Sequence, residues 1–456
     1  MTFSALDSSL TGPLFATDAM RAVFSDEARL AAMLAAEAAL ARAQAQFELV
    51  PPSLADAIAA VGAGDLDAEA IGRRAAIAGV PTIPFLKALQ ARLPPELEPH
   101  LHKGATTQDV LDTALVLQMR AAFRLVARDL SPVLLGLERL AQAHRATPCA
   151  GRTYGQHAAP VTFGFKAAVW AAGLAEVAAR LPDVARRALT PSLSGPVGTF
   201  AAMGGHGPAV VEAFAAELGL EAAPIAWHTR RVALVEAGTW LATLLGALAK
   251  LAGDVAHLAT TEVGEVAEPH LPGRGGSSAM PHKRNPVGCT VILAAASAAK
   301  GHVGTLLDAM VAAHERPAGA WHAEWHALPA LFGLASGALR EARLIAEGLV
   351  VDAARMRANL QLTRGLLFAD AVAGRLAAAI GREAAHDAVE AAADRVRAGA
   401  GSLAETLRAN PSLAAIPDEI LATERDLDAA VDAAGPWIDR ALPVCAGARA
   451  DLAALG

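Results

Sequence analysis

Long apolar segments with helical periodicity constrain the fold of this chain more than any other feature. Four of them are rich in Ala and Leu and poor in β-branched residues, and they lie near residues 161–181, 230–263, 287–313 and 328–348. Apolar residues recur at the spacing of a helix almost everywhere, and the alternation typical of strands is almost absent. The pattern predicts an all-α fold.

Two helix starts can be predicted from capping residues. Ser25 precedes two acidic residues and a periodic apolar segment, and Thr107 opens a long run that continues to Leu130. Ser and Thr hydroxyls at such positions accept hydrogen bonds from the free N–H groups of the first turn. Pro132 should kink or divide the second helix, because proline interrupts the hydrogen-bond ladder.

The composition excludes several classes of protein. The chain has 456 residues and a net charge of −7, and no basic stripe offsets that charge, which argues against a nucleic-acid partner. The cysteines are too few and too scattered for a disulfide framework, and the N-terminus has no basic region followed by an apolar core. We therefore expect a cytoplasmic protein.

The apolar segments predict burial rather than a membrane span. The charge-free stretch 188–211 contains prolines and glycines, and Lys250 and Lys300 interrupt the runs around Leu241 and Val291, so we expect no helix that crosses a bilayer. Helices with Ala and Leu on most faces have little polar surface to present to water. We expect them inside a bundle larger than one subunit.

A glycine-rich segment, 272–286, concentrates groups that chemistry requires. Its part 276–286 contains two hydroxyls and three basic side chains: Ser277, Ser278, His282, Lys283 and Arg284. Asn285 and Pro286 are a good N-cap and first helical residue, so the loop should end at a helix N-terminus that favours an anion or a serine alkoxide. A charged surface loop is the plain alternative, whereas a nucleotide phosphate loop would need Ser or Thr directly after Lys283.

The run Gly276-Ser277-Ser278-Ala279-Met280-Pro281-His282-Lys283-Arg284-Asn285-Pro286 resembles the signature loop GSSxMPxKxNP of the fumarase/aspartase superfamily at every specified position. Two more segments resemble other active-site regions of that superfamily. They are 102–113, which begins His-Lys-Gly-Ala-Thr-Thr-Gln-Asp, and 151–164, which begins Gly-Arg-Thr-Tyr-Gly-Gln-His-Ala. Three matches in the expected order make the resemblance specific, and it extends over most of the chain.

The resemblance implies an architecture and an assembly. We expect a long central helical bundle flanked by two smaller helical domains, with the chain divided into residues 1–112, 113–352 and 353–456. It also implies a homotetramer in which three subunits contribute to each active site. No cofactor and no metal ion is expected; His322 and His326 flank Glu324, but their spacing is not that of a zinc-binding His-Glu-x-x-His helix.

The resemblance also implies the chemistry and the site residues. Members of the superfamily make or break a bond β to a carboxylate while a proton moves at the α carbon, which requires a base or acid over that carbon and donors around the carboxylate. The catalytic residues would be Ser277, with Ser278 as the alternative, and Lys283. The substrate-binding residues would be His102, Thr106, Thr107, Arg152, Thr153, Tyr154, Gln156, His157, His282, Asn285 and Arg316.

Some of these assignments have plain alternatives. Thr106 and Thr107 are also ordinary capping residues, and both roles can hold together. Arg152 and Arg316 would either bind a carboxylate or form interface ion pairs. Tyr154 would shape the bound substrate, replace a missing acid, or simply pack.

Two departures from the superfamily pattern narrow the expected reaction. Tyr154 stands where many of these lyases have a histidine, and Thr290 stands where they have the glutamate that partners it. A cycloisomerase tolerates both losses, because a carboxylate of the substrate is the nucleophile. Residues 314–325 resemble the muconate enzymes of the superfamily, so we expect a small tricarboxylate substrate, 3-carboxy-cis,cis-muconate, converted to its lactone in protocatechuate breakdown. The alternative is a β-elimination lyase that acts on a substituted succinate.

Overall fold

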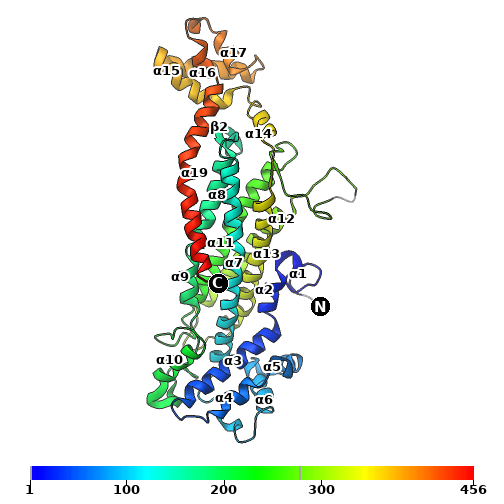
Figure 1. Ribbon diagram of the computed structural model, residues 1–456, viewed down its shortest axis with the longest axis vertical. Helices are drawn as coiled ribbons and strands as arrows, with labels where there is room; N and C mark the ends of the chain where they lie inside the picture. The colour runs from blue at the N-terminus through cyan, green and yellow to red at the C-terminus, as the bar shows by residue number, and fades with distance from the viewer. Residues whose placement is uncertain (1–2, 277–278, 456) are drawn as a thin grey trace.

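The computed structural model describes residues 3–276 and 279–455 and is an elongated bundle of helices (Figure 1). The helices are α1 (Gly12–Phe15), α2 (Asp18–Val23), α3 (Asp26–Ala45), α4 (Ser53–Ala59), α5 (Ala68–Ala78), α6 (Thr82–Gln90), α7 (Thr107–Ala143), α8 (Phe163–Ala178), α9 (Leu181–Ala188), α10 (Gly207–Glu217), α11 (Val232–Leu258), α12 (Val287–Ala309), α13 (Ala320–Gly348), α14 (Ala353–Asn359), α15 (Ala369–Ile380), α16 (Arg382–Arg397), α17 (Leu403–Arg408), α18 (Asp418–Leu421) and α19 (Glu424–Ala453). The strands are β1 (Pro148–Thr153), β2 (Gln156–Thr162), β3 (Val266–Ala267) and β4 (Val350–Val351).

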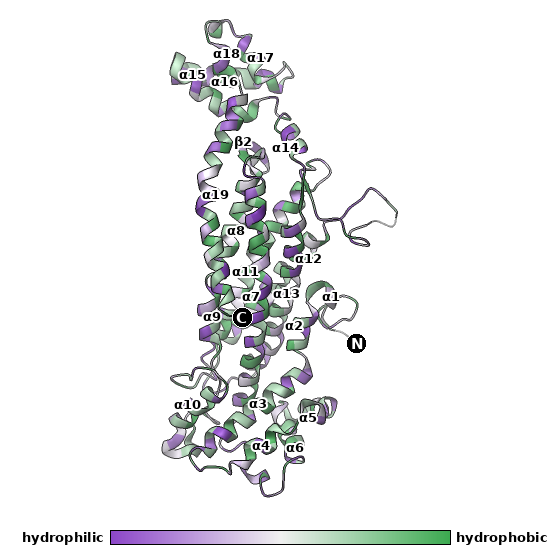
Figure 2. Ribbon diagram, viewed as in Figure 1, coloured by the Kyte–Doolittle hydropathy of each residue, from purple (hydrophilic) through white to green (hydrophobic). Residues whose placement is uncertain are grey.

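The main hydrophobic core lies between the long helices α7, α8, α11, α12, α13 and α19, which pack against one another along the bundle. Green, hydrophobic residues follow these central helices in Figure 2. Phe123 of α7 is nearly fully buried, and its ring meets those of Phe332 and Trp240 edge to face. Burying such large apolar side chains is the main stabilising contribution in a fold of this kind.

Smaller helices cover both ends of the bundle (Figure 1). Helices α3 to α6 gather at the lower end around a second apolar cluster, together with α10. Helices α15 to α18 gather at the upper end around a third cluster, and α14 packs against β1. The two ends of the bundle are therefore separated by the length of α7.

The all-α prediction is confirmed, with two local corrections. Among the described residues, strands form two short antiparallel pairs, β1 with β2 and β3 with β4, which periodicity did not predict. Ser25 caps α3 as expected, because its hydroxyl accepts the N–H of Ala28 at 3.1 Å. Pro132 does not divide α7, which continues as one helix to Ala143, and a kink at Pro132 stays a prediction.

The expected division at 112 and 352 remains a proposal. Residue 112 lies inside α7, and Asp352 caps the N-terminus of α14. The C-terminal part does not stay apart from the bundle, since α19 returns from the upper end to pack against α7 and α8 (Figure 1).

Two helices bear on the expectation that no helix crosses a bilayer. By length and composition alone, α11 and α12 are long and apolar enough to cross a bilayer. Core helices meet the same criteria, and both pack against α13, so no span is inferred. Only 28% of the apolar window of α12 is buried in one copy, and Leu293 and Leu307 stay 39% and 49% exposed. An apolar helix face of this kind is typical of subunit contacts.

Candidate active site

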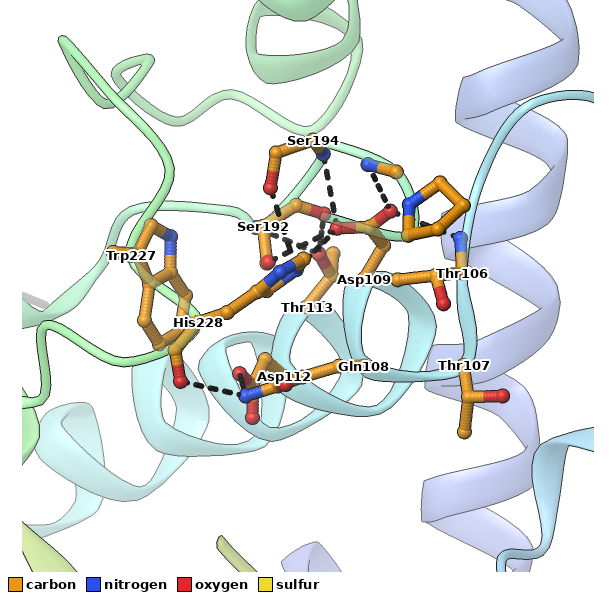
Figure 3. Close-up of polar contacts among 12 residues, drawn as sticks. Thr106, Thr107, Gln108, Asp109, Asp112, Thr113, Ser192, Ser194, Trp227 and His228 are labelled. Carbon is orange, nitrogen blue, oxygen red and sulfur yellow. Dashed lines mark hydrogen bonds and ion pairs between the residues drawn. The ribbon is translucent and has the colours of Figure 1, made fainter. Parts of the chain in front are cut away.

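The first signature segment forms the N-terminus of α7. Thr106 is the N-cap and Thr107 is the first helical residue, as predicted. The carboxylate of Asp109 accepts the N–H of Thr106 at 3.0 Å, so this helix end is capped by its own third residue. Thr107 lies apart from the buried contacts of its neighbours (Figure 3).

Asp109 also ties two distant segments to this helix end. Dashed lines in Figure 3 converge on its buried carboxylate, which lies 2.7 Å from Nε2 of His228. It accepts further hydrogen bonds from the N–H groups of Ser194 and Gly195, each at 2.9 Å, and from the hydroxyl of Ser192 at 3.3 Å. A buried carboxylate with this many donors is stable only because its charge is fully paired.

Arg316 completes this region. Its guanidinium donates to the hydroxyl of Thr106 at 3.2 Å, to Oε1 of Gln108 at 3.1 Å and to the carbonyl of Pro196 at 3.3 Å. The guanidinium therefore stands beside Thr106, and no salt bridge joins it to any of the described residues. Sequence reasoning missed the segment 192–196, although its Ser-Gly-Pro run is a turn signal.

A buried cluster of charged side chains packs at the same end of α7. Arg231 lies between the carboxylates of Asp112 and Glu324 and stacks 4.9 Å from the ring centre of Trp227. Burial lowers the pKa of Arg231, but the two carboxylates raise it more, so it remains charged. Glu324 is therefore committed to Arg231 and not to the histidines beside it.

His102 stands close to this region with a carboxylate partner of its own. Its Nδ1 lies 2.6 Å from Oε1 of Glu37, which is 1% exposed. Burial alone would lower the pKa of His102, but the Glu37 carboxylate outweighs it, and the net shift is upward. The Glu37 carboxylate therefore favours the protonated form of His102, which suits a site for a carboxylated substrate.

The second signature segment is the β1–β2 hairpin at the upper end of the bundle (Figure 1). Tyr154 and Gly155 form its turn, and both have positive φ, at 52° and 76°. Tyr154 is fully exposed at the tip, so a packing role within its own subunit is wrong. Thr153 and Gln156 are exposed beside it.

Arg152 and His157 face each other across this hairpin. Arg152 donates to both carboxylate oxygens of buried Glu265, at 2.6 and 3.0 Å, and Asn359 donates to the same carboxylate at 2.8 Å. The guanidinium of Arg152 therefore fixes the hairpin to the bundle through Glu265. Burial, followed by the Arg152 charge, lowers the pKa of His157, and its buried Nδ1 has no partner among the described residues.

The third signature segment is the loop that leads into α12. Ser277 and Ser278 lie outside the described residues. His282, Lys283 and Asn285 are exposed in one copy of the chain. The two ends of the loop meet, because the N–H of Asn285 donates to the carbonyl of Gly275 at 2.8 Å.

The N-terminus of α12 corrects an expectation. The helix begins at Val287 with Pro286 as N-cap, one residue later than predicted. Its first free N–H groups, those of Gly288 and Cys289, donate to the carboxylate of Glu268 at 3.0 and 2.8 Å. They are therefore occupied by a side chain of the same protein, and the expectation that they receive a substrate anion or a serine alkoxide was wrong.

One chain does not bring the first two segments together. Thr107 begins α7 and the hairpin follows its end, and 37 residues of helix at about 1.5 Å each span roughly 55 Å. A small tricarboxylate is several times shorter than that distance. If the first two segments act on one substrate molecule, they must come from different copies.

Residues 14–301 match the model of the family described as lyase. This chain belongs to that lyase family, within the fumarase/aspartase superfamily. A 3-carboxy-cis,cis-muconate cycloisomerase of Pseudomonas putida is 47% identical over 84% of this chain and 90% of the relative. A nitrosuccinate lyase of Streptomyces davaonensis is 43% identical over 96% of this chain and 97% of the relative. The crystal structure of the 3-carboxy-cis,cis-muconate lactonizing enzyme from Pseudomonas putida has a TM-score of 0.87 at 42% identity, covering 98% of this chain and 100% of that one.

The superfamily resemblance inferred from the three segments is thereby confirmed, and the chain is an enzyme of the lyase family. The structure also places Thr290, one of the two positions at which the sequence departs from the superfamily pattern. Thr290, which stands in place of a partner glutamate, donates its hydroxyl to the carbonyl of Pro286 at 2.9 Å. This hydroxyl is therefore bonded to the N-cap residue of its own helix.

Proposed function

We propose that this lyase-family enzyme is a cycloisomerase that interconverts 3-carboxy-cis,cis-muconate and a carboxymuconolactone in protocatechuate breakdown, and that it works in the cytoplasm. The match with the lactonizing enzyme over the whole length of both chains carries the proposal. The intact signature loop agrees with it, since Ser277, Lys283 and Asn285 stand at the superfamily positions.

The proposed reaction needs few enzyme acids. A carboxylate oxygen of the substrate forms the new C–O bond at a conjugated double bond, and the electron pair moves toward the substrate carboxylate at the far end. One proton then adds to the α carbon, with Ser277 as its donor in this direction and the base in reverse, and Ser278 as the alternative. Because no amine leaves, the histidine and glutamate replaced by Tyr154 and Thr290 are not required.

Charge in the intermediate must be stabilised by side chains rather than by the α12 N-terminus, which Glu268 occupies. Lys283 would polarise one substrate carboxylate with Asn285 and His282. Thr106 and Thr107 would clamp another, with Arg316 and His102 as the nearby positive groups. Thr153, Tyr154, Gln156 and His157 would line the site from the hairpin, and Arg152 would position them through Glu265.

Freshly prepared 3-carboxy-cis,cis-muconate, followed by its diene absorbance, tests the activity. The absorbance should fall with enzyme concentration, and a diene that persists at high enzyme concentration would contradict the proposal. Ser277→Ala should lower kcat by roughly two to four orders of magnitude, which is the range for a lost acid or base. Wild-type turnover in that variant would remove Ser277 from the chemistry.

A nitrosuccinate lyase is the second candidate, favoured by the similarity over 96% of the chain. Nitrite is a good leaving group, so this reaction also needs no enzyme acid. Release of nitrite and fumarate from nitrosuccinate, with no loss of the muconate diene, would establish it instead.

We further propose a homotetramer in which each site draws on three subunits. The exposed apolar face of α12 and the roughly 55 Å between the first two segments support this arrangement. Thr107→Val and His157→Ala should each be nearly inactive alone. Co-expressed in one tetramer, they should restore roughly a quarter of the sites, because random mixing gives that fraction two intact contributors. No recovery in isolated mixed tetramers would contradict shared sites.

A further inference from the structure

The signature loop leaves and rejoins the protein through one narrow neck. Gly276 and Arg284 form an isolated antiparallel bridge, and Asn285 donates to Gly275 beside it. Gly275 has φ +68°, and a Cβ there would lie 2.6 Å from the carbonyl oxygen of Asn285. The neck therefore requires glycine, and its position sets where the rest of the loop begins and ends.

Glu268 holds the outgoing side of this neck. It follows β3 and is 20 residues away from Gly288 in the sequence. Its two carboxylate oxygens accept the N–H groups of Gly288 and Cys289, and its side chain is only 8% exposed. A carboxylate at a helix N-terminus is stabilised by those N–H groups and by the helix dipole.

The same carboxylate meets the incoming side of the neck. Nη2 of Arg274, the residue before Gly275, lies 3.5 Å from Oε2 of Glu268 and also pairs with Glu341 of α13. Arg340 in turn donates to Glu341 and to the backbone carbonyl of Pro13. The loop is thus connected at both ends through Glu268 to the central bundle.

Gly288 makes this close approach possible. A Cβ at that position would lie 3.1 Å from Nη2 of Arg274 and 3.2 Å from both carboxylate oxygens of Glu268. The helix end, the arginine and the carboxylate are therefore packed in direct contact. Low exposure strengthens each of these charged hydrogen bonds.

We propose that Glu268 is a positioning residue of the signature loop. It clasps the incoming side through Arg274 and the outgoing side through the first N–H groups of α12. Its function is to hold Lys283 and Asn285 at the place where they can reach a substrate bound by other copies. Glu268 itself contacts no reacting atom. The inference rests on the proposed function only where turnover is measured.

Glu268→Ala and Glu268→Gln test the proposal in the full-length protein. Hydrogen exchange followed by mass spectrometry reports the N–H groups of Gly288 and Cys289 without any substrate. We expect Glu268→Ala to speed their exchange by roughly tenfold, because a helix end without a cap frays. Glu268→Gln keeps an uncharged acceptor and should have a smaller effect.

Steady-state kinetics then separate positioning from stability. At a temperature where the variant keeps the helical content and mass of the wild type, kcat of Glu268→Ala should fall roughly 10- to 100-fold, since misplacement by about 1 Å has effects of that size. KM should change much less. Glu405→Gln is the matched control, because Glu405 also accepts a backbone N–H at a helix start, that of Ser402, far from the loop. It should leave kcat unchanged.

Each outcome decides the proposal. Wild-type kcat in a folded Glu268→Ala variant overturns it, and so does a lower kcat with unchanged exchange at Gly288 and Cys289. If Glu268→Ala does not fold, Glu268→Gln and Arg274→Ala are judged by the same two measurements. If the wild type does not convert 3-carboxy-cis,cis-muconate, kcat is measured with nitrosuccinate instead. Failure of the proposed function is then distinguished from failure of the proposed role of Glu268.

Discussion

Helix α7 begins within the first signature segment and α12 begins directly after the third, and a carboxylate caps each N-terminus, yet the two caps are built differently. Asp109 belongs to the first turn of α7 and is buried among segments that it holds together. Glu268 comes from outside α12 and lies at the edge of the bundle beside the loop. The first cap is part of the core, whereas the second is a clasp on a surface loop.

The two caps should therefore affect different properties of the protein: the α7 cap its stability, and the α12 cap its turnover. Loss of Asp109 would leave several buried donors without a partner, which is costly to the whole fold. Loss of Glu268 would free N–H groups at a helix end that water can reach, which costs less. We therefore expect the α7 cap to determine whether the protein folds and the α12 cap to determine how fast it works.

Asp109→Ala should have the largest effect. It leaves the N–H groups of Thr106, Ser194 and Gly195 unpaired, and we expect the free energy of unfolding to fall by about 3–5 kcal/mol, as when one partner of a buried charged network is removed. Urea unfolding followed by circular dichroism measures it. Asp439→Ala, which removes an exposed partner of Arg145, is the control and should change stability little. Equal losses of unfolding free energy in Asp109→Ala and Asp439→Ala would contradict the structural role given to the α7 cap.

Arg316→Ala should have the next largest effect, on substrate affinity. The guanidinium stands beside Thr106 without a salt-bridge partner among the described residues, so it is free to meet a carboxylate. We expect KM to rise roughly tenfold, which corresponds to one lost charged hydrogen bond. Unfolding should be nearly unchanged. Arg343→Ala removes an exposed arginine of α13 and should leave KM at the wild-type value; an unaltered KM in Arg316→Ala would place that residue outside the site.

The contrast between the two caps also explains which features of the site could be predicted from the sequence. The cap of α7 is local, with Thr106 and Asp109 in the spacing of a capping pattern, and its helix start was predicted correctly. The cap of α12 lies 20 residues upstream, and no local pattern indicates which carboxylate will reach it. An ion pair was one of the two roles expected for Arg152, but its partner Glu265 lies 113 residues away in the same chain and could not be identified from the sequence.

The periodic helices followed from side-chain spacing, whereas the β1–β2 hairpin did not. Its outer residues are exposed, so no apolar alternation marks it, and a positive φ at Tyr154 is invisible in the sequence. The role of neighbouring copies is also beyond a single sequence. Residue types predict a capping hydroxyl or an apolar face, but long-range pairing depends on the folded path of the chain.

Gly288→Ala should have a modest effect confined to the loop side. The added methyl would press against Arg274 and Glu268, which must shift by a few tenths of an ångström. We expect kcat to fall roughly threefold to tenfold, because overpacking displaces a neighbour rather than removing it. Gly374→Ala, where a Cβ meets nothing within 4 Å, is the matched control in another helix. A larger kcat loss in the control than in Gly288→Ala would contradict the clasp geometry.

The smallest expected effect is a pH dependence on the α7 side. Glu37 raises the pKa of His102 above its ordinary 6.5 despite burial. Above about pH 6.5 the folded protein therefore keeps a proton that the unfolded chain has released, so this contribution to stability is complete below that pH and is lost as pH rises through the folded pKa. Between about pH 6 and pH 8 the urea midpoint of the wild type should fall more steeply than that of Glu37→Gln, in which the raising charge is absent. Parallel midpoints in the two proteins would mean that the His102 pair contributes no pH dependence to stability.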